Sequence, residues 1–126
     1  ILVILLFAPV FGFNRELTVS LLPKSVTTAI GVPLSQLSGG LSAVTTAAIA
    51  ITGNLAAIIG PFLCKVFRLT DPVAQGVAFG TSGHVVGTSK ASELGDLPAA
   101  AGSLSLVIAG ILTAVLYPFA LMIFVG

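Results

Sequence analysis

The feature that most limits how this chain can fold is an uncharged run of 40 residues, from Ser25 to Cys64. A straight α-helix of that length would be roughly 60 Å long, about twice the thickness of the hydrocarbon core of a bilayer. The run must therefore turn. Turn-forming residues occur at two places in it, Gly31-Val32-Pro33 and Ser38-Gly39-Gly40. The sequence thus predicts one interrupted element over 17–38 and a continuous transmembrane helix over 41–64.

The composition indicates that lipid surrounds this chain. Of its 126 residues, 56% are hydrophobic and only 7% are charged, and the mean hydropathy is +1.18. A soluble domain averages about a quarter charged residues, and one of this size cannot bury so much apolar surface. We therefore expect an integral membrane protein. The net charge of +1, without a basic patch, argues against a nucleic-acid partner.

Enzymatic chemistry and metal binding find little support in the sequence. Cys64 is the only cysteine and His84 the only histidine, so this chain alone cannot build a multi-ligand nitrogen/sulfur metal site or an internal disulfide. A serine–histidine–acid set could be assembled only from Ser82, His84 and a loop acid, Asp71 or Asp96, without the surrounding pattern of a nucleophile elbow. We expect neither an enzyme nor a bound cofactor.

The rest of the chain divides at its charges, glycines and prolines. Residues 1–14 are too short to span a bilayer and are interpreted as the end of a helix in a fragment of a longer membrane protein. Asp71-Pro72 is a typical helix start. It opens a polar, glycine-rich element over 73–93. A turn at 95–98 then leads into a second continuous transmembrane helix over 99–124.

Two parts of the chain resemble each other. Residues 51–62 align with 108–119 at an offset of 57, with six identities in twelve positions. The alignment predicts an internal repeat, as is common in transporters, although apolar helices with Gly and Pro can also resemble each other by chance. At the same offset Ser25 falls on Ser82 and Thr27 on His84. The expected organisation is a single fragment, 1–126, of a membrane domain, with repeat units at about 17–64 and 72–124.

The few cations suggest a topology. By the positive-inside rule, Lys65, Arg68 and Arg15 lie in cytoplasmic loops. If both interrupted elements cross the membrane, the turns at 39–40 and 93–96 lie outside. A re-entrant hairpin in place of either element would overturn this alternation.

Two polar clusters, 23–28 and 80–90, fall near the expected middle of the membrane. Irregular backbone is tolerated there only inside protein or beside a water-filled cavity, and a broken helix presents free N–H groups that suit a small carboxylate. On a continuous helix, Thr81, His84 and Thr88 would share one face. The predicted substrate-binding residues are Lys24, Ser25, Thr27, Thr28, Thr81, Ser82, His84, Thr88 and Lys90.

Each of these features also has a structural interpretation. The pairs Gly76/Gly80 and Gly83/Gly87 are typical of close helix packing, and hydroxyls in membrane helices often bond to their own backbone. Lys24 could instead extend to the membrane interface. If the repeat and a shared site are real, the two polar clusters should approach within about 20 Å, less than the thickness of the hydrocarbon core.

His84 has a more specific expected role. Histidine is the side chain that changes charge near neutral pH. A bound carboxylate favours the charged imidazolium, so substrate and proton would stabilise each other's binding. This is the coupling that a proton-linked anion carrier needs.

At these residues the chain resembles the LrgB/CidB family of bacterial membrane proteins. The resemblance covers about 14–118 and its main strings are Pro23-Lys-Ser-Val-Thr-Thr28, Ile51-Thr-Gly53, Ile59-Gly-Pro61, Asp71-Pro-Val-Ala74, Gly80-Thr-Ser-Gly-His84-Val-Val-Gly-Thr-Ser-Lys90 and Glu93-Leu-Gly95. Family members are about twice as long, so the chain is similar to their C-terminal half. Gly83 departs from the pattern, which has a serine before the histidine, and this puts a direct role of that position in doubt.

The resemblance implies an all-α, multi-pass membrane protein of the bacterial cytoplasmic membrane, or of the plastid envelope in a plant. The family is described as antiholin-like, modulating murein hydrolase activity and autolysis with a holin-like LrgA/CidA partner. A plastid relative transports glycolate and glycerate, and some bacterial members are linked to pyruvate uptake. Two hypotheses follow: a transporter of small monocarboxylates, or a regulatory subunit acting through a holin-like partner. The oligomeric state is left open.

Overall fold

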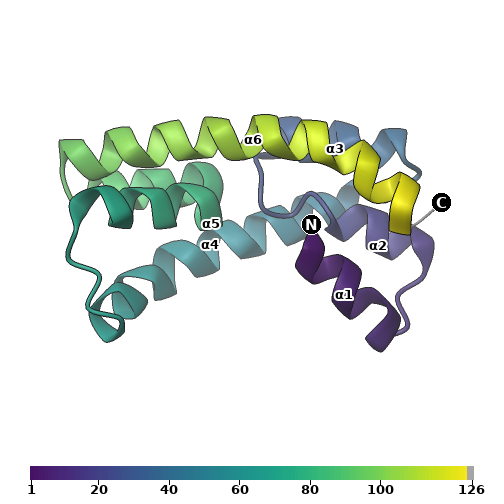
Figure 1. The fold of residues 1–126 in the computed structure, drawn as a ribbon, viewed down its shortest axis with the longest axis horizontal. Coiled ribbons are helices and arrows are strands. Elements are labelled where there is room, and N and C mark those ends of the chain that lie inside the picture. The colour runs from purple at the N-terminus through teal and green to yellow at the C-terminus, as the bar shows by residue number, and fades with distance from the viewer. Residues whose placement is uncertain (125–126) are drawn as a thin grey trace. The chain divides into compact units, whose positions relative to one another are not determined.

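The computed structural model describes residues 1–124, and this part of the chain is entirely helical, as expected. Figure 1 shows its elements. They are α1 (Leu2–Val10), α2 (Arg15–Leu21), α3 (Thr28–Leu37), α4 (Ser42–Val66), α5 (Pro72–Ser92) and α6 (Asp96–Phe124). The chain forms two compact units, which are described one at a time. The first comprises Ile1–Ile49 and the residues from Gly110 onward, and the second comprises Ala50–Ala109.

The two long helices confirm the two predicted continuous helices. Both α4 and α6 are long and apolar enough to cross a membrane, over Ser42–Val66 and Asp96–Ile123. Only 11% and 17% of their most apolar windows are buried within the protein. Their apolar surfaces therefore face outward, as lipid-facing helices require.

In the first unit, the interrupted element expected over 17–38 is a helical hairpin made by α2 and α3. The side chain of Asn14 caps α2 by accepting the Leu17 N–H at 2.8 Å. Six residues, 22–27, separate the two helices. A Cβ added to Gly31 of α3 would lie 3.1 Å from the carbonyl oxygen of Pro23. The first turn of α3 therefore lies beside the beginning of the connection, and the chain reverses.

Three buried hydroxyls hold this hairpin against the start of α4. Ser20, Ser35 and Thr45 are each fully buried. The Thr45 hydroxyl lies 2.9 Å from the Ser20 carbonyl oxygen and 2.7 Å from the Ser35 hydroxyl. The Leu41 N–H donates to the Ser20 hydroxyl at 2.7 Å. Such bonds replace the water that a bilayer excludes, and they fix α2, α3 and α4 as one group.

The apolar core of the first unit forms around the other face of the hairpin. Tyr117 of α6 is 1% exposed and its hydroxyl donates to the carbonyl oxygen of Val19 at 3.2 Å. The buried members of this core are Ile4, Leu5, Val19, Leu22, Tyr117 and Ala120.

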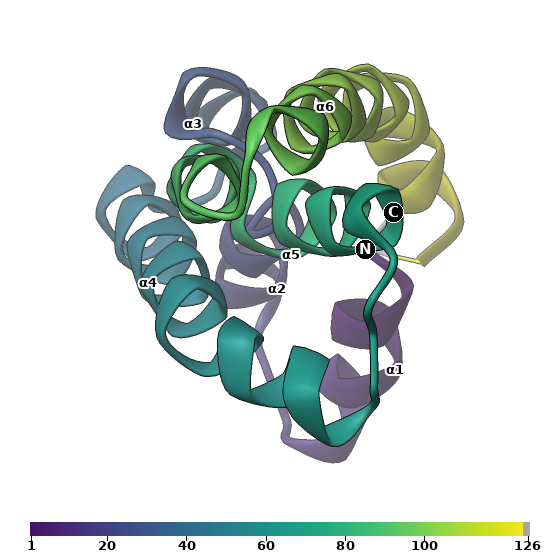
Figure 2. The ribbon, with the colours of Figure 1, turned by 90° about the vertical axis from the view of Figure 1, so that its left-hand side faces the viewer.

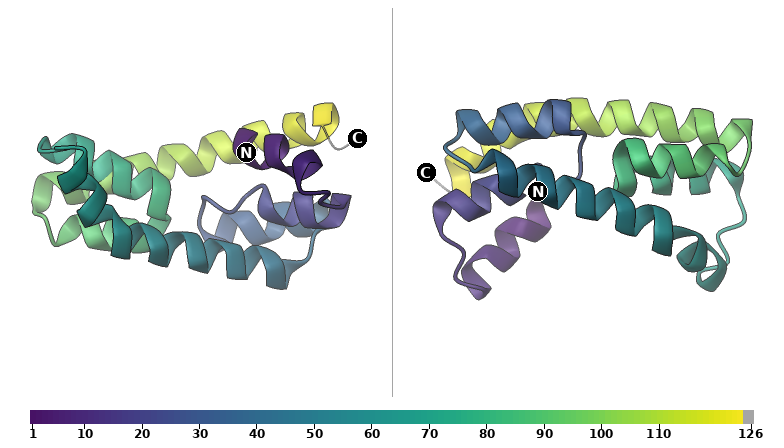
Figure 3. Two further views of the ribbon diagram at one scale, coloured as in Figure 1. Left: turned by 90° about the horizontal axis from the view of Figure 1, so that it is seen from below. Right: turned by 180° about the vertical axis from the view of Figure 1, so that it is seen from behind.

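In the second unit, α5 is also a hairpin, with its reversal at one residue. The Asp71 carboxylate caps the helix by accepting the Ala74 N–H at 2.7 Å. The helix is interrupted at His84, where φ is 43° and ψ is −130°. A Cβ on Gly87 would collide with the carbonyl oxygen of Phe79. These two residues would be about 12 Å apart along a straight helix, so the segments 72–83 and 85–92 lie side by side (Figures 1 and 3).

The helix is interrupted within the polar cluster 80–90, where irregular backbone was expected, but not at a glycine. The glycines of α5 lie within the helical segments, and the interruption falls on His84 itself. The glycines allow close packing instead: a Cβ on Gly76 would meet the Pro98 backbone of α6, and one on Gly80 would meet the Gly102 backbone. Figure 2 shows the two segments of α5 beside α6 in this unit.

The reversal bears on two points that the sequence left conditional for the element over 73–93. Leu94, which follows α5, lines the same cavity as Arg68 and Thr70, which precede it. Both ends of α5 therefore lie at one end of the unit, which matches the hairpin and not the crossing element, the two forms that the sequence left open. Thr81 and Thr88 do not share a helix face, because the left-handed backbone at His84 interrupts the helical periodicity between them.

Candidate functional site

The nine predicted substrate-binding residues fall into two groups. The first group lies at the reversal of the α2–α3 hairpin in the first unit, and the second lies along α5 in the second unit. Each group is described within its own unit. The approach of the two clusters within about 20 Å stays a prediction.

The reversal of the first hairpin brings together Lys24, Ser25, Thr27 and Thr28. Lys24 is half-buried, and its ammonium donates to the Ser25 hydroxyl at 3.3 Å. Thr27 is the residue before α3, with an extended backbone (φ −68°, ψ 153°), and its side chain does not cap the helix. The hydroxyls of Ser25, Thr27 and Thr28 donate no hydrogen bond to any residue among 1–124.

This geometry suits an anion. The N–H groups of the first turn of α3 have no side-chain acceptor, and the positive end of the helix dipole lies there. One ammonium and three hydroxyls with free protons stand at the same turn. Charge-assisted hydrogen bonds from such groups favour a carboxylate or another small oxyanion.

The hydroxyls of the second group are already used as donors. The hydroxyls of Thr81, Ser82 and Thr88 donate to helix carbonyl oxygens one turn earlier, at 2.7, 2.6 and 2.8 Å. Lys90 forms an ion pair with Glu93 at the outer end of the second segment of α5. An anion could recruit these groups only by displacing bonds that the chain makes to itself.

His84 is held within the second unit by a glycine of α4. Its side chain is 4% exposed. A Cβ on Gly53 would lie 2.8 Å from the imidazole Nε2, so the ring packs directly against the backbone of α4. Next to it, a Cβ on Gly83 would lie 2.8 Å from the Cβ of Ala56. The reversal of α5 is therefore clamped against α4.

Gly53 and the buried hydroxyls of the first unit are functional candidates that sequence reasoning did not single out. One signal was available for Gly53, because the repeat alignment pairs it with another glycine, Gly110, at the offset of 57. In the first unit, Gly110 lies against Ile30 of α3, with 2.8 Å between its added Cβ and the Ile30 Cδ1. No comparable pattern pointed to Ser20, Ser35 or Thr45.

Metal ligands are not gathered anywhere in the part of the chain that the structure describes: within residues 1–124, no three His, Cys, Asp or Glu side chains lie close enough together to hold an ion. The candidate site is thus a site for an organic or inorganic anion built from an ammonium, hydroxyls and backbone N–H groups.

Comparison with known proteins adds to this picture. No solved structure matches the chain. A family model described as the LrgB-like family matches residues 1–123. The match covers nearly the whole sequence and includes both hairpins and both long helices, and the chain therefore belongs to the LrgB-like family.

Proposed function

We propose that this chain is the substrate-binding part of a membrane transporter for small monocarboxylates of the glycolate, glycerate and pyruvate class. The observation that carries the proposal is the uncapped start of α3 beside Lys24. A single ammonium matches a single carboxylate. The hydroxyls of Ser25, Thr27 and Thr28 can donate to the carboxylate or accept from the substrate's own hydroxyl.

The charge available favours a monocarboxylate over a dicarboxylate. Lys90, the other lysine of the predicted site, is already paired with Glu93. A second substrate carboxylate would therefore have no unpaired ammonium in the proposed group, and desolvating it would be costly. We propose His84 as the proton-linked group of this transporter.

The internal repeat is part of this proposal, and the bounds of the elements support it. Shifting the start of α2 by 57 gives residue 72, where α5 starts, and shifting the end of α4 gives 123, next to the end of α6 at 124. Each repeat then consists of a helical hairpin followed by a long helix. Transporters with internal repeats place substrate sites at discontinuous helices of this kind.

The proposed location is a cell membrane, which the chain crosses more than once. In this placement α4 and α6 span the bilayer, and the two hairpins enter it without crossing. Irregular backbone at the hairpin reversals is then shielded by protein or by the water-filled path of the substrate.

Transport by the purified protein tests the proposal. The full-length protein is reconstituted alone into liposomes, and uptake of radiolabelled glycolate and pyruvate is measured against a dicarboxylate of similar size. We expect uptake of the monocarboxylates that saturates, and its loss in the Lys24→Met variant.

The alternative function gives a different result in the same assay. An antiholin-like subunit would show no uptake alone, and would change murein hydrolase activity only together with a holin-like LrgA/CidA partner. Liposomes that contain correctly inserted protein but take up neither monocarboxylate would overturn the transport proposal.

A further inference from the structure

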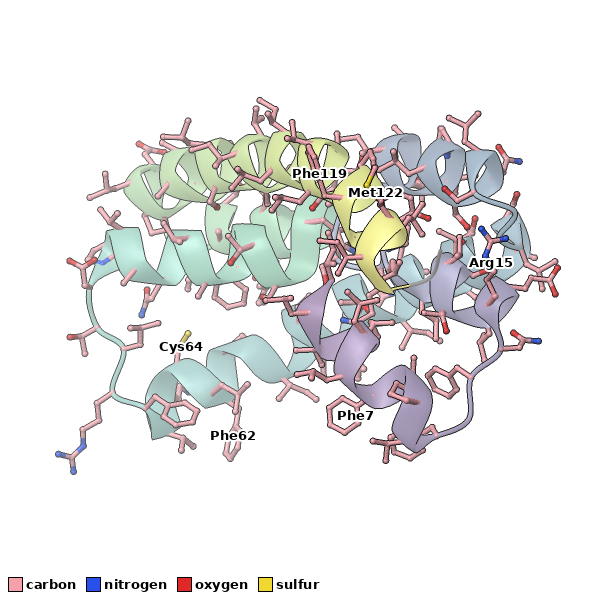
Figure 4. The ribbon with its side chains drawn as sticks, turned by 45° about the vertical axis from the view of Figure 1, so that its right-hand side comes forward. Phe7, Arg15, Phe62, Cys64, Phe119 and Met122 are labelled. Atoms are coloured by element: carbon pink, nitrogen blue, oxygen red, sulfur yellow. The ribbon has the colours of Figure 1, made fainter. Side chains whose placement is uncertain are left out.

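A cavity, here called the slot, lies in the second unit, between α4 and α5. It has a volume of about 200 Å³ and is formed between α4 and the first segment of α5. Gly60 opens this space, because a side chain there would collide with the Phe79 ring. Figure 4 shows Cys64 directed from α4 toward α5, whereas Phe62 points away from α5. The apolar lining includes Gly60, Leu63, Cys64, Phe67, Ala78 and Phe79.

A second, larger cavity of about 470 Å³ adjoins it at the end of α4 and forms the mouth of the slot in our interpretation. The two cavities share Cys64, Leu69 and Phe79 in their walls. Two cations, Lys65 and Arg68, line the mouth. The slot, which is apolar except for Ser82, therefore adjoins a basic opening.

The backbone turns sharply after the end of α4, and the residues of this turn line the mouth. Arg68 has a left-handed backbone with φ of 52°, and the Leu69 N–H donates to the Cys64 carbonyl oxygen at 2.8 Å. This is a helix-ending arrangement that usually employs glycine.

Within the described part of the chain, neither cation of the mouth has an acidic partner. The ion pair between Lys90 and Glu93 of the second unit involves neither of them. The nearby Asp71 carboxylate is occupied as the cap of α5. The mouth thus presents two unpaired positive charges, and the exposed hydroxyl of Thr70 lies beside them.

We propose that this cavity binds one anionic phospholipid, with an acyl chain in the slot and the phosphate at Lys65 and Arg68. The charge of the mouth and the apolar slot fit the two halves of such a molecule. Lys65 lies in the last turn of α4 and Arg68 follows its end, and a helix long enough to span the bilayer ends where the phosphates of a membrane lie. The lipid site shares only Ser82 with the nine predicted substrate-binding residues, and it does not include the reversal of the first hairpin, on which the proposed carboxylate site rests.

Native mass spectrometry of the full-length protein in detergent tests the lipid site. The probes are phosphatidylglycerol and phosphatidylcholine with identical acyl chains, and free glycerol 3-phosphate. We expect phosphatidylglycerol to be retained preferentially. Lys65→Gln and Arg68→Asn should each lower its retention about five-fold, since a basic residue near an anionic membrane surface contributes about 1 kcal/mol. Asparagine at 68 tolerates the left-handed backbone, so this variant keeps the fold.

Matched variants separate the site from general effects. Arg15→Gln removes a cation outside the second unit and should leave retention unchanged. Ala78→Leu fills the slot and should lower retention of both phospholipids, whereas Ala114→Leu adds the same side chain to an exposed position of α6 and should not.

The proposal is overturned if the variants at 65 and 68 retain phosphatidylglycerol like the parent protein. It is also overturned if glycerol 3-phosphate displaces the lipid, since the mouth would then be a site for free phosphate esters. A third contrary result is protection of Cys64 from maleimide in lipid-free dimers, which would make the cavity a contact between two copies. Lipid-dependent protection of Cys64 in monomers supports the proposal.

Discussion

The two helical hairpins share a plan but differ at the point where each chain reverses. The first hairpin turns through six residues, 22–27, while α5 turns at His84 alone. A tight reversal brings the two segments so close that a side chain at 87 would meet backbone, and a glycine stands there. At the corresponding position of the first hairpin, Ile30, the wider turn leaves room for a large side chain.

The two hairpins therefore differ in how their polar groups are used, although the sequence pattern suggests the same use for both. The wide turn of the first hairpin leaves its hydroxyls and one ammonium free to meet a ligand. The tight turn of the second places a buried histidine against α4 and commits its hydroxyls to helix carbonyls. In our proposal the first reversal binds the carboxylate, whereas the second is packed against α4.

The largest effect is expected from Gly87→Val, which tests whether the second hairpin needs its tight packing. The added side chain meets the Phe79 backbone, which cannot move aside as a side chain can. We expect a loss of about 3 kcal/mol in the free energy of unfolding, at the upper end of the usual cost of overpacking. Thermal unfolding in detergent measures it, with Ser89→Val on an exposed position as control. Equal midpoints for Gly87→Val and the parent would show that the segments are not closely packed.

Lys24→Met tests the binding role of the first hairpin. A charge-assisted hydrogen bond contributes about 1.5–3 kcal/mol, so affinity for glycolate or pyruvate should fall by about ten-fold or more at every pH from 5 to 8. Titration calorimetry on the purified protein measures the affinity. The matched control is Lys90→Met, which removes a lysine already paired with Glu93 and should change affinity little. A larger loss for Lys90→Met than for Lys24→Met would reverse the comparison.

Thr45→Val tests whether buried hydroxyls stabilise the first hairpin, as close packing at glycines stabilises the second. It keeps the shape of the side chain but removes the contacts to Ser20 and Ser35. Interhelical hydrogen bonds in membrane proteins contribute about 1 kcal/mol, and we expect a loss of that size in the free energy of unfolding. Thr46→Val changes the exposed neighbour and should have no measurable effect. An equal, small effect of both variants would mean that apolar packing alone fixes this hairpin.

The smallest effect at any single pH is expected from His84→Gln. Glutamine stays polar but cannot take up a proton, so the variant should fold and insert, yet lose the pH dependence of uptake. His84→Asn provides a second variant, since asparagine tolerates the left-handed backbone at this position. Uptake profiles between pH 5 and 8 make the comparison. An unchanged profile in both variants would assign His84 to packing alone.

The sequence predicted the long helices well, because their ends are marked by charge and by turn residues. The helix expected over 41–64 is Ser42–Val66, and the one expected over 99–124 is Asp96–Phe124. Asp71 caps its helix as the Asp-Pro pattern indicated. These features depend only on neighbours in the sequence.

The reversal of the hairpins could not be read in the same way. A crossing element and a re-entrant hairpin contain the same residues, and the difference lies in which backbones approach each other, such as Phe79 and Gly87. Nor does the sequence show that the hydroxyls of Thr81 and Thr88 donate to carbonyls while that of Thr27 does not. Those distinctions depend on backbone geometry at two turns.

The reversal of α5 has a consequence for counting sides of the membrane. In the proposed placement a hairpin returns to the side from which it entered, so each hairpin–helix pair makes one net crossing. Because each hairpin–helix pair crosses the membrane once, the second pair starts from the opposite side to the first. The two pairs then have inverted orientations in the membrane, although their sequence pattern is the same. Reporter fusions after Thr70 and after Glu93 should then report the same side of the membrane, opposite to that of Gly39.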